Sequence, residues 1–172
     1  CMGKDLAEAK ALIKYAFKLK SPIVVRYPKL NEEYGADVEI TSSNWERIKK
    51  GNEAVIITYG PDVLRINKLI EENNLDITLI NARFINPIDL KMLNEILSYN
   101  IPIYVIEQVV LDGSLGETIA RIMTSKQINL PLNLISIPTN SYIPQASLAD
   151  LLKMFKLDNE SLLKELKKYE IR

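Results

Sequence analysis

The segment that decides the fold covers residues 101–107 and reads Ile101-Pro102-Ile103-Tyr104-Val105-Ile106-Glu107. It carries no charge before Glu107 and is rich in β-branched residues. Such a run predicts a strand buried on both faces, which is typical of a parallel sheet covered by helices. The next segment, Gly113-Ser114-Leu115-Gly116-Glu117, predicts a turn and a helix start, because Ser114 and Glu117 have the spacing of a capping box. The sequence therefore predicts an α/β fold with this strand near the centre of its sheet.

The alternation of strand and helix continues on both sides of this central strand. An edge strand is predicted at about 45–50, and further strands at 54–59, 77–81 and 132–137. Helices are predicted after Pro61-Asp62, after Asp89, after Ser114, and at about 147–156 and 159–169. This order implies a mostly parallel sheet with right-handed crossovers, covered by helices.

The first 28 residues stand apart from this alternation. Residues of about 5–20 predict an amphipathic helix with a capping box at Asp5 and Glu8, and residues 23–27 predict a short buried strand. This helix and strand have no sheet of their own, so we expect residues 1–28 to be the end of an upstream α/β domain. Residues 29–43 are polar and aperiodic, which predicts a linker, and residues 44–172 then form the second domain.

Composition narrows the possible functions. Lys and Arg total 22 and Asp and Glu total 22, so the balanced charge disfavours nucleic acid and anionic membrane surfaces as partners. One cysteine and no apolar run of membrane-spanning length favour a cytoplasmic protein. The chain has no histidine, which excludes a Ser-His-Asp triad or a histidine-bound zinc, and self-contained catalysis is not expected. Because the chain begins at Cys1, we expect it to be a fragment of a longer polypeptide.

Four features could carry chemistry, and each has two interpretations. The turn at Gly113 and Gly116 could cradle an anion, although a tight turn and close helix packing explain its glycines better. Glu107 could act as a general acid or base, but a carboxylate that caps nearby N–H groups is favoured. Arg83 could bind a ligand, and a structural ion pair is at least as well supported. For Arg26, which closes an apolar strand, phosphate binding and ion pairing are equally supported.

Four segments, in order, resemble the 1-deoxy-D-xylulose-5-phosphate synthase family. They are Val25-Arg26-Tyr27-Pro28-Lys29, then Ile80-Asn81-Ala82-Arg83-Phe84-Ile85-Asn86-Pro87-Ile88-Asp89, then Val105-Ile106-Glu107 with Gly113 and Gly116, and finally Ile143-Pro144-Gln145-Ala146-Ser147. The resemblance covers nearly the whole chain and corresponds to the carboxyl-terminal part of that enzyme. Two positions depart from the usual family pattern: Lys29-Leu30 stands where Arg-Gly is usual, and Ser114 replaces a glycine.

The resemblance implies an enzyme that joins pyruvate to glyceraldehyde 3-phosphate with loss of carbon dioxide, for isoprenoid, thiamine and pyridoxal phosphate synthesis. It also implies a homodimer that uses thiamine diphosphate and Mg²⁺. Residues 1–28 would end the pyrimidine-binding domain, and residues 44–172 would form a transketolase-type C-terminal domain. The family's cofactor and catalytic residues lie upstream, so the resemblance assigns no catalytic, cofactor or metal residue to this chain. It assigns one substrate residue, Arg26, to the phosphate of the aldehyde.

Two alternatives remain open at this point. Part of the pattern is shared with transketolases and with the beta subunits of 2-oxo acid dehydrogenases, so the chain could be the equivalent part of such a subunit or of a split transketolase. The missing histidines also permit a non-catalytic α/β binding or dimerisation module.

Overall fold

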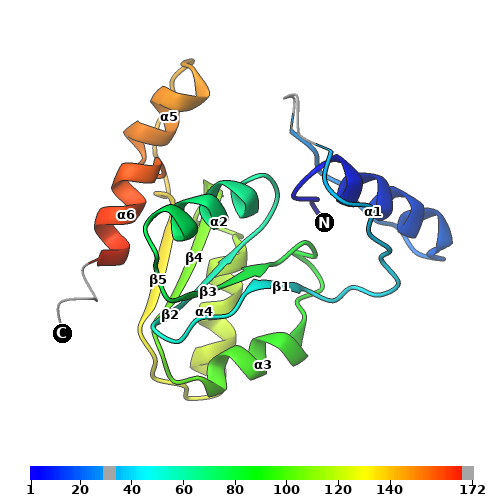
Figure 1. Cartoon of the computed structure of the whole chain (residues 1–172), viewed down its shortest axis with the longest axis horizontal. Helices are drawn as coiled ribbons and strands as arrows, with labels where there is room; N and C mark the ends of the chain where they lie inside the picture. The colour runs from blue at the N-terminus through cyan, green and yellow to red at the C-terminus, as the bar shows by residue number, and fades with distance from the viewer. Residues whose placement is uncertain (29–33, 168–172) are drawn as a thin grey trace. The chain divides into compact units, whose positions relative to one another are not determined.

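The computed structural model describes residues 1–28 and 34–167. Its strands form one mixed, mostly parallel sheet in the order β1-β3-β2-β4-β5 (Figure 1). The chain divides into two compact units, residues 1–103 and 104–172, and the division falls inside β4. The α/β prediction and the mostly parallel sheet are confirmed.

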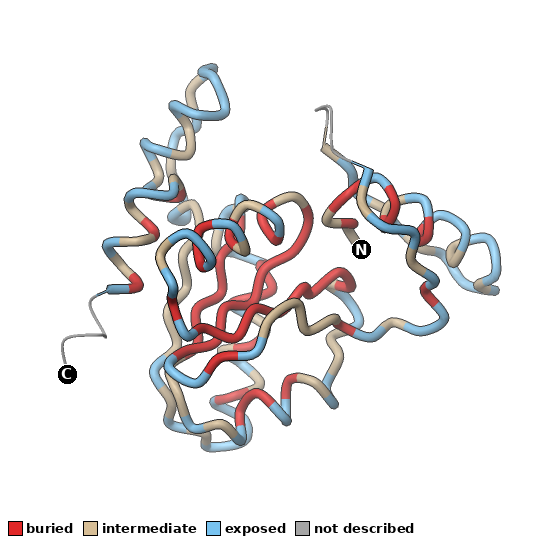
Figure 2. Tube along the Cα trace, viewed as in Figure 1, coloured by how far each residue is buried: buried red, intermediate tan, exposed pale blue. Residues whose placement is uncertain are grey.

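The first unit contains the elements α1 (Leu6–Lys18), β1 (Glu46–Lys49), β2 (Ala54–Thr58), α2 (Asp62–Glu72), β3 (Ile77–Asn81) and α3 (Leu90–Ser98). Strands β2 and β3 are parallel and buried along their whole length, whereas the edge strand β1 is antiparallel to β3. Figure 2 shows β2 and β3 as continuous buried segments. Helix α2 packs against β3 and buries the predicted stripe of Val63, Ile66 and Ile70.

The second unit continues β4 (Ile103–Val110) and adds α4 (Leu115–Ser125), β5 (Leu132–Ile137), α5 (Leu148–Met154) and α6 (Asn159–Lys167). The first five residues of β4 are buried, as its uncharged sequence predicts, and the strand runs three residues past Glu107. Helix α4 packs against β5. The two C-terminal helices lie where the sequence predicts them, although the end of the second falls outside the described residues.

The N-terminal segment differs in two respects from its prediction: residues 23–27 form no ladder, and they are not buried, since Val24 is 76% and Tyr27 is 78% exposed. Helix α1 forms, but residues 23–27 make only an isolated parallel bridge between Met2 and Arg26 instead of a strand in a ladder. A ladder needs a neighbouring strand that pairs at several successive residues. In the described residues, the segment 23–27 pairs at Arg26 alone. The predicted strand is therefore present as one bridge.

Part of the predicted linker takes part in packing. Residues 29–33 lie outside the described residues, and residues 34–43 contain no helix or strand. Ile40 is nevertheless buried in a cluster with Ala11, Leu12 and Phe84. Tyr15 of α1 meets the Phe84 ring edge-on, with 5.6 Å between the ring centroids. Apolar contacts thus attach α1 to the segment that follows β3.

Candidate functional site

Arg26 is exposed and forms the isolated bridge with Met2. Its backbone N–H donates to the carbonyl of Cys1 at 2.9 Å. Within residues 1–28 and 34–167, no carboxylate pairs with its guanidinium. Arg26 is among the residues that line a cavity of about 490 Å³, whose other polar lining includes Ser21, Ser43 and Asn86. The guanidinium is therefore available to an anion from outside the described chain.

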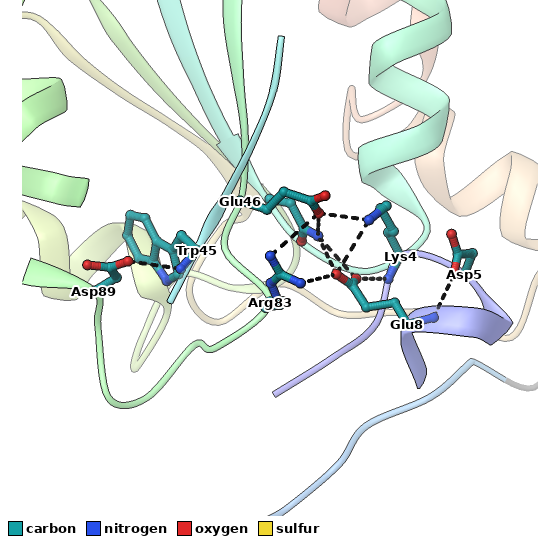
Figure 3. A network of polar contacts seen from close by, with 8 residues as sticks. Lys4, Asp5, Glu8, Trp45, Glu46, Arg83 and Asp89 are labelled. Carbon is teal, nitrogen blue, oxygen red and sulfur yellow. Dashed lines mark hydrogen bonds and ion pairs between the residues drawn. The ribbon is translucent and has the colours of Figure 1, made fainter. Parts of the chain in front are cut away.

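Arg83, the second arginine singled out in the sequence, is buried and paired. Its Nη1 donates to Oε1 of Glu8 at 2.9 Å, and its Nη2 lies 3.7 Å from Oε2 of Glu46. Figure 3 shows its guanidinium directed between these two carboxylates. The ion-pair interpretation of Arg83 is confirmed, because its guanidinium pairs with both carboxylates.

Glu8 is the centre of this polar cluster, which we call the α1–β3 cluster and define as Lys4, Glu8, Glu46, Asn81 and Arg83. The Glu8 side chain is fully buried and also accepts from the Asn81 amide at 3.0 and 3.1 Å. The Lys4 ammonium donates to Glu46 at 2.7 Å. Two cations face two anions, so burial is compensated by pairing. The sequence pattern explained Glu8 as a capping residue and gave no signal for this cluster.

The cluster also sets the ionisation of Glu46. Partial burial by itself would raise the pKa of this carboxyl, but hydrogen bonds from Lys4 and Asn81, together with the charges of Lys4 and Arg83, outweigh it. The pKa of Glu46 is therefore lowered from its ordinary value of 4.5. The carboxyl of Glu46 stays ionised in the neutral range and holds the two cations.

Glu107 closes the N-terminus of α4 with its own carboxylate. The side chain is 2% exposed and accepts from the N–H groups of Leu115 at 3.1 Å and of Gly116 at 2.8 Å. Ser114 accepts from the N–H of Glu117 at 3.0 Å, which completes the predicted N-cap. These bonds use the N–H groups that an anion would need. The capping interpretation of Glu107 is confirmed.

The two glycines of this turn have separate structural reasons. Gly113 has a φ of +73°, a conformation that side-chain-bearing residues rarely adopt. A Cβ at Gly116 would lie 2.8 Å from Leu134 Cδ2 and 3.4 Å from Val105 Cβ. The tight-turn and close-packing interpretation of the glycines is therefore correct.

The described residues contain no cluster of metal-ligating side chains, and the glycine turn before α4 is not open to an anion. In residues 1–28 and 34–167, no three carboxylate, cysteine or histidine side chains converge on a point where they could hold an ion. The glycine turn before α4 is already occupied by Glu107. No helix in this part of the chain has the length and apolar character needed to cross a bilayer.

These features define a class of protein: an α/β domain with a mixed, mostly parallel five-stranded sheet and a glycine turn closed by an internal carboxylate. The family described as "Transketolase, C-terminal domain" matches residues 43–162. The chain belongs to this family.

Curated relatives extend the match beyond this domain. The chain is 30% identical to a 1-deoxy-D-xylulose-5-phosphate synthase of Clostridium tetani over 96% of its length, and 31% identical to that of Listeria welshimeri over 94%. It is 28% identical to the Macrococcus caseolyticus synthase over 99%. The chain spans 27–28% of the length of these relatives.

A solved structure has a similar fold. It is described as "Split gene transketolase, inactive beta4 tetramer" and superposes with a TM-score of 0.79 at 19% identity. The match covers 98% of this chain and 56% of that one. At this identity the likeness concerns the fold.

Proposed function

We propose that this chain is the carboxyl-terminal part of a cytoplasmic synthase that condenses pyruvate with glyceraldehyde 3-phosphate and releases carbon dioxide. The product is 1-deoxy-D-xylulose 5-phosphate, a precursor for isoprenoid, thiamine and pyridoxal synthesis. The upstream part of the same polypeptide supplies the catalytic residues and binds thiamine diphosphate and Mg²⁺, and the enzyme is a homodimer. Alone, the chain is inactive and serves a structural and dimerising role.

One observation carries this proposal: the similarity to named synthases continues ahead of the transketolase-type domain. The family match begins at residue 43, whereas the match to the Macrococcus caseolyticus synthase covers 99% of the chain and so includes the segment around Arg26. The solved split-gene transketolase also covers 98% of this chain, but at 19% identity, whereas the named synthases are 30% and 31% identical over 96% and 94% of it. This higher identity over nearly the whole chain supports a synthase, with residues 1–28 as the end of its pyrimidine-binding domain.

Arg26 is the substrate residue in this proposal. A guanidinium offers two parallel N–H donors to phosphate oxygens, a geometry that the lysine ammonium cannot reproduce. Arg26 is exposed and has no carboxylate partner in the described part of the chain, which favours phosphate binding over the structural ion pair. We propose that it binds the phosphate of the aldehyde.

The test compares the two substrates in the assembled enzyme. Arg26→Ala should raise the KM for glyceraldehyde 3-phosphate at least about tenfold, equivalent to roughly 1.4 kcal/mol, and leave the KM for pyruvate unchanged. Arg26→Lys should recover only part of this loss. Arg121→Ala, which removes an exposed arginine of α4, is the matched control and should leave both constants unchanged. If Arg26→Ala weakens both substrates and lowers the Tm, Arg26 has a structural role instead.

A second candidate is the corresponding chain of a split enzyme, such as a split transketolase. The solved neighbour described as a split-gene transketolase matches 98% of this chain, which favours this arrangement as the alternative. The gene context separates the two candidates. A Gly-Asp-Gly-type magnesium motif upstream in the same reading frame supports the synthase, and the same motif on a separate chain supports a split enzyme. Its absence from both would favour a non-catalytic module.

A further inference from the structure

Arg83 binds the N-terminal segment through its side chain and its main chain. Its Nη1 donates to the buried carboxylate of Glu8 at 2.9 Å, and its carbonyl accepts from the N–H of Met2 at 2.9 Å. Both partners lie ahead of residue 43, where the family match begins. Arg83, two residues past the end of β3, is therefore bonded to the segment that carries Arg26 through both its side chain and its main chain.

The carboxylate of Glu8 links Arg83 to the backbone that follows Met2. Its Oε2 accepts from the backbone N–H of Lys4 at 2.7 Å, while its own backbone N–H donates to Oδ1 of Asp5 at 2.7 Å. Figure 3 shows these bonds converging on the first turn of α1. The Glu8 carboxylate thus fixes the turn between Met2 and α1 as well as neutralising Arg83.

This turn lies directly beside Arg26. Met2 and Arg26 form the isolated parallel bridge, and the Arg26 N–H donates to the carbonyl of Cys1 at 2.9 Å. The Arg26 backbone has no other ladder in the described residues. Ile23 and Val25 also pack against the apolar cluster that contains Phe84. The position of Arg26 relative to β3 therefore depends in part on residues 1–4, which Arg83 and Glu8 hold.

We infer that the buried Arg83–Glu8 pair is a positioning pair for Arg26, and that it thereby sets the affinity for the substrate phosphate. The inference rests on the proposed function of Arg26. A bidentate contact between guanidinium and phosphate needs correct placement of both N–H donors, so a small displacement of the Arg26 backbone weakens it. Neither Arg83 nor Glu8 touches the substrate.

The test uses the assembled enzyme with the double variant Glu8→Leu/Arg83→Met. These side chains keep similar volumes and leave no unpaired buried charge, while the bonds from Glu8 to Lys4 and Asn81 are lost. The KM for glyceraldehyde 3-phosphate should rise at least about threefold, with the kcat and the KM for pyruvate unchanged. Unphosphorylated glyceraldehyde should be used as well as before. Amide hydrogen exchange in peptides covering residues 1–28 should become faster, which reports the displacement without relying on activity.

The matched control is Glu95→Leu/Arg47→Met. Arg47 pairs with Glu95 between β1 and α3, and neither residue bonds to residues 1–28. This variant should leave both KM values and the exchange of residues 1–28 unchanged. Arg83→Lys, which keeps a cation beside Glu8, should recover most of the affinity lost in the double variant.

The outcomes separate this inference from the proposed function. If Arg26→Ala raises the KM for glyceraldehyde 3-phosphate and the double variant does not, the positioning role is overturned and the proposed function stands. If Arg26→Ala has no effect, the proposed phosphate-binding role of Arg26 fails and this inference fails with it. Should the double variant not fold, Glu8→Gln replaces it, since the neutral amide loses the ion pair; an unchanged KM for the aldehyde would then overturn the inference.

Discussion

Nη1 of Arg83 lies 2.9 Å from Oε1 of Glu8, a residue 75 positions earlier in the chain. The Glu8 side chain is fully buried and that of Arg83 is 11% exposed, so the pair is shielded from water. A buried pair of this kind contributes little net stability as a whole, but losing one partner strands the other. The pair therefore makes the attachment of α1 sensitive to single substitutions.

Removing one partner should cost more than removing both. Arg83→Met leaves the Glu8 carboxylate buried without its main counter-ion and should lower the free energy of unfolding by roughly 3 kcal/mol. Glu8→Leu/Arg83→Met should lose clearly less. Urea unfolding can be followed by the fluorescence of Trp45, the single tryptophan, which is 3% exposed and donates from Nε1 to the carbonyl of Phe84. Equal losses in the two variants would contradict the stranded-charge argument.

The lowered pKa of Glu46 predicts acid sensitivity with a definite sign. Because its pKa is depressed in the folded state, its stabilising contribution is present above the ordinary value of 4.5 and is lost as the pH falls through the folded pKa. The difference in unfolding free energy between the wild type and Glu46→Gln should therefore be constant near neutral pH and shrink below that value. If the difference in unfolding free energy between the wild type and Glu46→Gln grew as the pH fell, the pKa of Glu46 would be raised and not lowered in the folded state.

The two glycines before α4 should respond differently to alanine. Gly116→Ala should cost about 1–3 kcal/mol, because its Cβ would meet Leu134 at 2.8 Å in a packed region. Gly113→Ala meets no atom within 4 Å and should cost about 1 kcal/mol, from its positive φ alone. Gly113→Asn should recover part of that loss, since asparagine tolerates this conformation, whereas Gly116→Asn should be worse than Gly116→Ala. Thermal unfolding of the four variants measures these differences.

An apolar stripe on α1 predicts self-association of the isolated chain. Leu6, Ile13 and Phe17 lie on one helical face and are 44%, 47% and 88% exposed. Sedimentation velocity should show association that increases with concentration, and Ile13→Ser/Phe17→Ser should reduce it. Lys14→Ser, a change on the same helix that removes no apolar surface, should leave it unchanged. A monomer at high concentration would count against the prediction.

The fold was predictable because its signals are local. The uncharged, β-branched run before Glu107 specifies a buried strand by itself, and Asp89 and Ser114 mark helix starts through bonds to residues three positions on. The capping role of Glu107 was also accessible, since its partners Leu115 and Gly116 follow within nine residues. Each of these inferences required only neighbours in the sequence.

The α1–β3 cluster was not predictable for the opposite reason. Arg83 could be recognised as a candidate for ion pairing, but its partner Glu8 already had a local explanation as a capping-box residue, and Glu46 lies on an edge strand where charge is ordinary. Pairing across such distances follows from the tertiary fold. The single bridge at Arg26 is similar, because a short apolar run specifies an extended segment and leaves the number of its neighbours open.

The residues of the α1–β3 cluster are translated at different times. Glu8 leaves the ribosome 75 residues before Arg83, so a growing chain can form α1 long before its buried counter-ion exists. Until β3 and Arg83 have emerged from the ribosome, the carboxylate of Glu8 must stay hydrated. Helix α1 cannot pack in its final position before then. The contacts of the N-terminal segment can therefore form only after residues 81–83 have been synthesised. Arg26 reaches its final position only after Arg83, which is translated 57 residues later.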